Sequence, residues 1–214
     1  NYAKSTNNWF NLVNKRKDLI ISCPHFIDIN EFSTKKLANK KFYFDIPGVM
    51  YEDRVNAKKY LNLIGRLRHY YYEIKRNLIF LVNRFQGKLS LDRIRKLNSQ
   101  FMNRIRNTKF VYTCGSMMKF PVRKFFEIPS QSSVLVCDEF YGMRHLGFKE
   151  SHNFISIEKF KKNIPIKDYQ MISESGYRLD KLYHSSDARL EQLRKCFNLI
   201  ENQNFSGSYW LESK

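Results

Sequence analysis

Apolar residues along the chain follow two spacings, which predict where strands and helices lie. Continuous apolar runs predict buried strands at residues 41–46, 77–83, 110–113, 133–137 and 153–156. Apolar residues at helical spacing predict helices at residues 52–75 and 89–105, and shorter or later helices are expected at residues 122–130, 141–146 and 157–203. The apolar side of the helix over residues 52–75 would be formed by Val55, Tyr60, Leu61, Ile64, Leu67 and Tyr71, leaving a basic outer face.

The order of these segments predicts an α/β fold. Strands alternate with helices, and most of the strands are apolar throughout, which is typical of a parallel sheet covered on both faces. We therefore expect a Rossmann-like parallel sheet with helices on both faces, followed by C-terminal helices. In such sheets ligands bind at the carboxyl ends of the strands, where loops lead into helices.

Composition and charge limit the classes of partner. The chain has 214 residues, of which 43% are hydrophobic, and this is enough for a packed core. Its net charge of +18 favours anionic partners: nucleic acid, an acidic membrane surface or phosphorylated small molecules. No apolar run approaches the roughly 20 residues that a bilayer requires. We expect a cytoplasmic protein that is peripheral to the membrane at most, and a first residue other than Met fits a piece of a longer protein.

Neither a disulfide framework nor a metal site is predicted. The four cysteines are far apart and form no CxxC pair, so reduced thiols are expected. The five histidines form no HxxxH or HExxH pair, and we expect His25 and His184 to be structural. The sequence also contains no GxGxxG, no P-loop and no Asp-x-Asp pair for a divalent ion on a sugar diphosphate.

Residues 119–139 carry the most informative chemistry. Pro121 is suited to open a helix, and the unpaired backbone N–H groups at the helix start, with Lys119 and Arg123, could bind a diphosphate. Glu127 lies four residues after Arg123. It could accept hydrogen bonds from ribose hydroxyls, or it could form an ordinary surface ion pair with Arg123.

This stretch resembles the donor-site segment of GT-B glycosyltransferases, particularly the group that includes the CgeB-like spore-maturation proteins. Three further segments are similar to that family in the order it requires: Pro24–Asp28 with Phe32, Phe44–Gly48 with Tyr51 and Arg54, and Gly176-Tyr177 followed by His184–Arg189. The matching residues of the stretch itself are Arg123, Phe126-Glu127, Ser130-Gln131-Ser132, Val134-Leu135-Val136 and Asp138-Glu139. The resemblance covers roughly residues 24–200.

The resemblance implies the donor-binding half of a transferase that moves a sugar from a nucleotide-activated donor to a glycan, lipid or protein acceptor without a metal or another cofactor. Gly48, Arg54, Lys119 and Arg123 would bind the donor phosphates, and Glu127 the ribose. Many retaining members have a glutamate where this chain has Lys119; a lysine cannot take a hydroxyl proton as a carboxylate does, but it can neutralise a diphosphate.

The resemblance also implies a division of the chain. Residues 1–23 would be a connector from, or a remnant of, an N-terminal domain that would normally supply the catalytic base. Residues 24–203 would form the nucleotide-sugar-binding domain with its C-terminal helices, and residues 204–214 a polar tail.

Two other functions stay open. A basic nucleic-acid-binding protein would explain the net charge and Tyr70–Tyr72, although no recognised nucleic-acid module is present. The second open function is that of a transferase-like domain that binds its ligand without catalysing a reaction. The basic residues on the two long predicted helices could form a solvated face, or they could attract membrane lipid or an anionic acceptor glycan: Arg66, Arg68, Lys75, Arg76, Arg93, Arg95, Lys96, Arg104 and Arg106.

Overall fold

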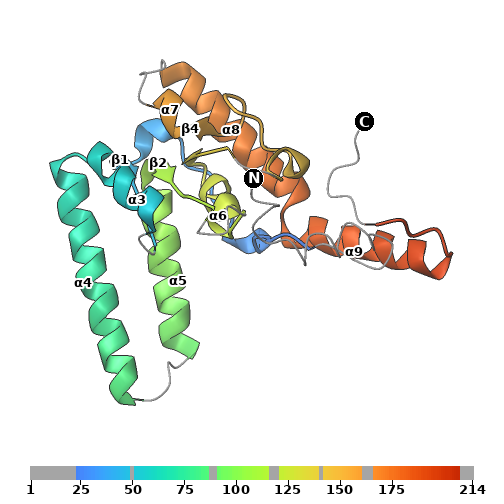
Figure 1. The fold of residues 1–214 in the computed structure, drawn as a ribbon, viewed down its shortest axis with the longest axis horizontal. Helices are drawn as coiled ribbons and strands as arrows, with labels where there is room; N and C mark the ends of the chain where they lie inside the picture. The colour runs from blue at the N-terminus through green and yellow to red at the C-terminus, as the bar shows by residue number, and fades with distance from the viewer. Residues whose placement is uncertain are drawn as a thin grey trace.

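A four-stranded, all-parallel sheet forms the centre of the molecule (Figure 1). The computed structural model describes residues 23–48, 51–86, 91–115, 121–139, 142–160 and 166–207. The strands are β1 (Phe42–Asp45), β2 (Thr108–Tyr112), β3 (Val134–Cys137) and β4 (Ile155–Ser156), and they lie in the order β1-β2-β3-β4. The predicted α/β fold with a parallel sheet is therefore confirmed.

Helices connect and follow the strands. The α-helices with described bounds are α3 (Glu52–Ala57), α4 (Leu63–Gln86), α5 (Leu91–Arg106), α6 (Lys124–Ser130), α7 (Ile157–Phe160), α8 (Ile166–Tyr183) and α9 (Ser186–Glu201). Short 3-10 helices are η2 (Ile29–Glu31), η3 (Leu37–Asn39), η4 (Lys58–Tyr60) and η5 (Arg144–Leu146).

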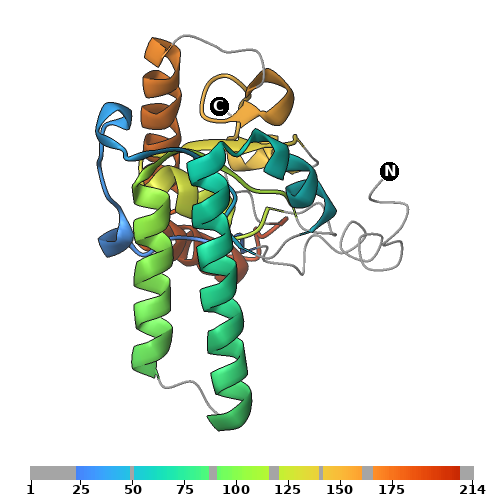
Figure 2. The same cartoon turned by 90° about the vertical axis from the view of Figure 1, so that its left-hand side faces the viewer.

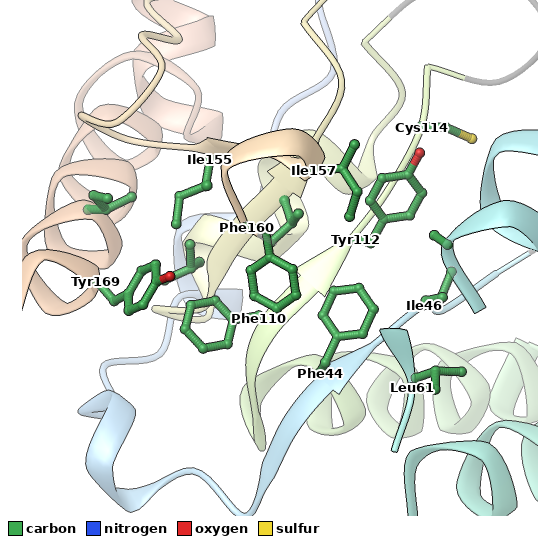
Figure 3. Close-up of a cluster of buried hydrophobic side chains, with 14 of the residues drawn as sticks. Phe44, Ile46, Leu61, Phe110, Tyr112, Cys114, Ile155, Ile157, Phe160 and Tyr169 are labelled. Carbon is green, nitrogen blue, oxygen red and sulfur yellow. The ribbon is translucent and has the colours of Figure 1, made fainter. Parts of the chain in front are cut away.

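One face of the sheet packs on α7 and the first turns of α8. Alternate residues of the strands point to this face, among them Phe44, Phe110 and Val136, and they pack with Phe160 and Tyr169 (Figure 3). The rings of Phe44 and Phe160 are stacked with centroids 4.9 Å apart. Aromatic side chains therefore fill much of this half of the core.

The opposite face packs on α5, α6 and η5. Val111 and Leu135, which alternate with the residues of the first face, meet Ile105 of α5 and Phe125 and Ile128 of α6. Helices on both faces explain why β3 and the second half of β2 are apolar throughout rather than alternating.

The long helices α4 and α5 form an antiparallel hairpin that extends away from the sheet (Figures 1 and 2). A buried charge cluster fastens the base of the hairpin to β1. Arg104 of α5 donates to both carboxylate oxygens of Asp45 at 2.6 and 2.7 Å, and Arg68 of α4 lies 2.6 Å from the same carboxylate. The guanidinium groups also lie over aromatic rings, Arg68 over Phe42 and Arg104 over Tyr72.

Two predictions about this region are wrong. Residues 77–83, predicted as a strand, belong to α4. The helix predicted over residues 52–75 is interrupted after η4, where buried Leu61 enters the core and the Asn62 side chain accepts a hydrogen bond from the Gly65 N–H at 2.8 Å to begin α4. The apolar side predicted for that helix is mostly exposed, because α4 projects beyond the sheet.

The other predicted elements lie close to their expected positions. The strands predicted at residues 41–46, 110–113, 133–137 and 153–156 correspond to β1 to β4, and the long region predicted as helical divides into α7, α8 and α9. Within the described ranges, no helix is both long enough and apolar enough to cross a membrane. All four cysteines are free thiols, three of them buried.

Candidate functional site

The carboxyl ends of β1 and β2 bring together residues that are far apart in the sequence. Gly48 lies just beyond β1, Thr113 follows β2 directly, and α6 begins after the loop that leaves β2. Arg54 comes from α3, the first helix after β1. This is the edge of a parallel α/β sheet at which ligands are expected.

Arg54 is held in a fixed orientation at this edge. Its side chain is only 1% exposed. One terminal nitrogen donates to the Pro47 carbonyl at 3.1 Å and the other to Thr113 Oγ1 at 2.8 Å, while the guanidinium carbon lies 5.8 Å from the ring centre of Tyr51. The guanidinium thus bridges the ends of β1 and β2 instead of extending into solvent.

Lys124 and Arg54 both approach the backbone of Gly48. A Cβ atom at this position would lie 2.6 Å from Arg54 Nη1 and 2.7 Å from Lys124 Cε, and Gly48 has a φ of +107°. Burial, followed by the charge of Arg54, lowers the pKa of Lys124 below its ordinary value. Two partly desolvated cations beside a glycine form a region of positive potential in which an anion would be stabilised.

Arg123 and Glu127 lie beside this pair as part of an ion-pair network. Arg123 Nε is 3.1 Å from Glu127 Oε1, and Arg123 Nη2 is 3.1 Å from Glu31 Oε2 of η2. Burial raises the pKa of Glu127, an effect that the charges of Arg123 and Lys124 oppose. The ion pair considered from the sequence is therefore present. Arg123 interacts with two carboxylates, and the charge of Glu127 also acts on Lys124.

Four of the five predicted donor-site residues thus lie near one another, in two adjoining groups: Gly48 with Arg54, and Arg123 with Glu127. Lys119, the fifth, lies outside the described residues. Lys124 was missed by the sequence reasoning, although it directly follows Arg123 at the predicted helix start.

Two hollows lie near the sheet. A small one of about 170 Å³ lies at the carboxyl ends of β2 to β4, and Asp53, Tyr112, Asp138 and Glu158 are among its lining residues. Tyr112 donates to Asp138 at 2.9 Å across it. Its lining has three carboxylates, which include Glu158, and one lysine, Lys59; this excess of negative charge disfavours a phosphate, so the cationic pair beside Gly48 is the better anion site.

A larger hollow of about 670 Å³ lies between α8 and the loop that leads into β4. It is lined by Ser151, His152, Asp168 and Arg178 among others, and His152 Nε2 is 3.3 Å from Ser175 Oγ. Because Ser151 and His152 precede β4, this hollow lies at the amino end of that strand, away from the edge that carries the predicted donor residues.

His184 has the structural role that was expected. Its ring is buried, with Nε2 2.8 Å from the Leu146 carbonyl and Nδ1 3.0 Å from Arg189 Nη2. Burial lowers the pKa of His184 to about 4, so Nε2 donates to the carbonyl and Nδ1 accepts from Arg189. The histidine, which directly follows α8, thus connects η5 with α9.

Among the described residues, no group of three or more His, Cys, Asp or Glu side chains is arranged to hold a metal ion. Comparison with known proteins gives no further assignment, because neither a family model nor a curated protein matches this chain.

Proposed function

We propose that this chain is the donor-binding part of a glycosyltransferase and that it binds the diphosphate of a nucleotide sugar between Arg54 and Lys124. The observation that carries the proposal is the convergence of these two cations on Gly48 at the carboxyl ends of β1 and β2. The resemblance of residues 119–139 and three other segments to GT-B transferases supports the same assignment.

The chemistry of this edge suits a departing phosphate. When a sugar leaves a nucleotide diphosphate, negative charge develops on the leaving oxygen, and fixed cations in a water-poor site stabilise it. Arg54 is oriented in advance by Pro47 and Thr113, so little reorganisation is needed on binding. In this proposal the two side chains take the part that a divalent ion has in metal-dependent transferases.

Gly48 and Glu127 complete the proposed site. The absence of a side chain at Gly48 leaves room for the Arg54 guanidinium and the Lys124 side chain beside its backbone. Glu127, which is 9% exposed, would exchange its pairing with Arg123 for hydrogen bonds from the ribose hydroxyls. Arg123, freed in part, would then reach the phosphates.

Calorimetric titration of the chain with UDP, GDP, CDP and CMP tests the proposal. We expect one nucleoside diphosphate to bind, and Lys124→Met to weaken its affinity about ten- to a hundredfold, because a hydrogen bond to a charged group contributes about 1.5–3 kcal/mol. Lys195→Met, which removes an exposed lysine of α9, is the matched control and should leave the affinity unchanged.

Two results would contradict the proposal: no binding of any of the four nucleotides, or equal affinity of the Lys124→Met and wild-type chains. The nucleic-acid alternative predicts a different outcome, in which oligonucleotides bind with a steep dependence on salt. Turnover of a labelled donor by the chain would exclude a domain that only binds.

A further inference from the structure

Helix α4 carries a regular apolar stripe that the described structure leaves exposed. Ile64, Leu67, Tyr71, Ile74, Leu78 and Leu81 are spaced alternately by three and four residues, which places them along one side of the helix. Each is 52–65% exposed. We call these six residues the α4 stripe.

The α4 stripe is not the side on which α4 meets α5. Contacts toward α5 and β1 use a different and more polar set of residues: Arg68 reaches Asp45, the ring of Tyr72 lies under Arg104, and Lys75 Nζ donates to Gln100 Oε1 at 2.8 Å. These contacts hold the hairpin together without burying the stripe.

The hairpin that carries the stripe is strongly basic. The sequences of α4 and α5 contain ten Lys and Arg residues and only two acidic residues, Glu73 and Asp92. Arg68 and Arg104 pair with the single carboxylate of Asp45, and Arg66, Arg95 and Lys96 are exposed. Exposed apolar side chains and exposed positive charge are therefore combined on one hairpin. The hairpin itself projects away from the sheet (Figure 2).

We infer that the α4–α5 hairpin binds an anionic membrane surface, with the α4 stripe at the boundary between headgroups and acyl chains. A helix with an apolar side and Lys or Arg on its other sides lies flat in this interface. The 24 residues of α4 span about 36 Å at 1.5 Å per residue, so the helix can lie along the surface rather than across it. The basic residues attract acidic lipid headgroups, and the stripe buries apolar area.

The charge of the hairpin favours an anionic membrane over a second copy of the chain as the partner of the α4 stripe. The heptad-like spacing would suit pairing of two α4 helices, but it would bring two basic hairpins together, and like charges facing each other destabilise an interface. Nucleic acid would satisfy the charge, yet it would leave the leucines and isoleucines of the stripe without an apolar partner. An acidic lipid surface satisfies both features.

This inference stands apart from the proposed donor site, since no residue is shared between them. It is tested by sedimenting the full chain with vesicles of phosphatidylcholine alone and of phosphatidylcholine with about 30% phosphatidylglycerol. We expect binding to the acidic vesicles only, and weaker binding as salt is raised because salt screens the attraction.

Charge substitution in the stripe separates insertion from simple attraction. Leu67→Glu with Leu78→Glu should reduce vesicle binding about tenfold or more, because apolar insertion is lost. Leu182→Glu with Leu190→Glu changes two similarly exposed leucines on α8 and α9, and should not reduce binding further than its added charge does. Arg95→Glu with Lys96→Glu should also weaken binding. Circular dichroism and thermal unfolding check that each variant is folded.

Several outcomes would overturn the inference. One is failure of the wild-type chain to bind acidic vesicles, and another is equal loss of binding in the stripe variant and its control. A wild-type dimer that the Leu67→Glu and Leu78→Glu changes dissociate would show that a second copy covers the stripe. Preference for an oligonucleotide over acidic vesicles would assign the hairpin to nucleic acid.

Discussion

Replacing Asp45 by asparagine should unfasten the α4–α5 hairpin from the sheet. The Asp45 carboxylate is 1% exposed and interacts with both Arg104 and Arg68 at 2.6–2.7 Å. An asparagine keeps the size of the side chain but removes the charge. The two guanidinium groups would then face each other in the interior without a counter-charge.

The expected loss in the free energy of unfolding follows from the burial of the Asp45 cluster. Removing one partner of a buried ion pair destabilises a protein by about 3–5 kcal/mol, because it leaves a desolvated charge uncompensated. Domains unfold with a free energy of about 5–15 kcal/mol, so this loss would be a large part of the total. For a chain of this size it corresponds to a fall in Tm of roughly 6–20 °C.

Urea unfolding at several pH values measures the effect and its sign. Burial raises the pKa of Asp45, but the hydrogen bond from Arg104 and the charges of Arg104 and Arg68 outweigh it, so the pKa lies below its usual value. A lowered folded-state pKa means that the stabilisation is present above the unfolded pKa, near 3.9, and is lost as pH falls through the folded pKa. The difference between wild type and Asp45→Asn should therefore be constant near neutral pH and shrink in acid.

The matched control is the exposed pair of Asp92 and Arg95, 3.5 Å apart on α5. Asp92→Asn should leave the unfolding midpoint unchanged, because exposed ion pairs contribute little. If Asp45→Asn lost less than about 1 kcal/mol at pH 7, the cluster would not be the buried, desolvated fastening described above.

Three further changes test other buried groups. Burial, with the charges of Lys35 and Arg106, lowers the pKa of Lys40 to about 7, so wild-type stability should rise between pH 7 and 9.5 in urea titrations, and Lys40→Met should remove that rise. Asp180 is fully buried, and burial raises its pKa well above the usual value. Asp180→Asn should therefore raise Tm at pH 7, and this gain in Tm should disappear near pH 4. A gain in Tm that is independent of pH would contradict the reasoning. Gly48→Ala should lower stability by about 1–2 kcal/mol, because φ is positive and the new Cβ displaces two cations, and should weaken nucleotide binding in the calorimetric titration.

The parallel α/β sheet could be predicted because most of its strands are short apolar runs that alternate with helices. The same rule, that a continuous apolar run forms a buried strand, gave a wrong prediction for residues 77–83. A continuous apolar run does not distinguish a buried strand from part of a helix, and here the run belongs to a helix that leaves the core. The alternating spacing of three and four from Ile64 to Leu81 was the signal that would have identified it.

The candidate site was predictable in part. Arg123 and Glu127 are neighbours on one helix, so their pairing follows from spacing alone. The closeness of Arg54 and Lys124 does not follow from their spacing in the sequence. It depends on how α3 and α6 are placed at the ends of β1 and β2. Lys124 has no distinguishing spacing, and only the fold brings it to Gly48.

The hairpin also bears on how the chain folds. Phe110 of β2 pairs with Val134 of β3, and Phe42 of β1 pairs with Thr108 of β2. The chain segment between β1 and β2 that the second pairing closes is more than twice as long as the segment between β2 and β3. Longer closures cost more chain entropy and slow the search for the partner strand. Because α4 and α5 are antiparallel and adjacent in sequence, association of the two helices before the sheet forms would bring β1 back to β2 and shorten that search. The α4–α5 hairpin, which we infer to bind the membrane surface, would thus also determine how fast β1 pairs with β2.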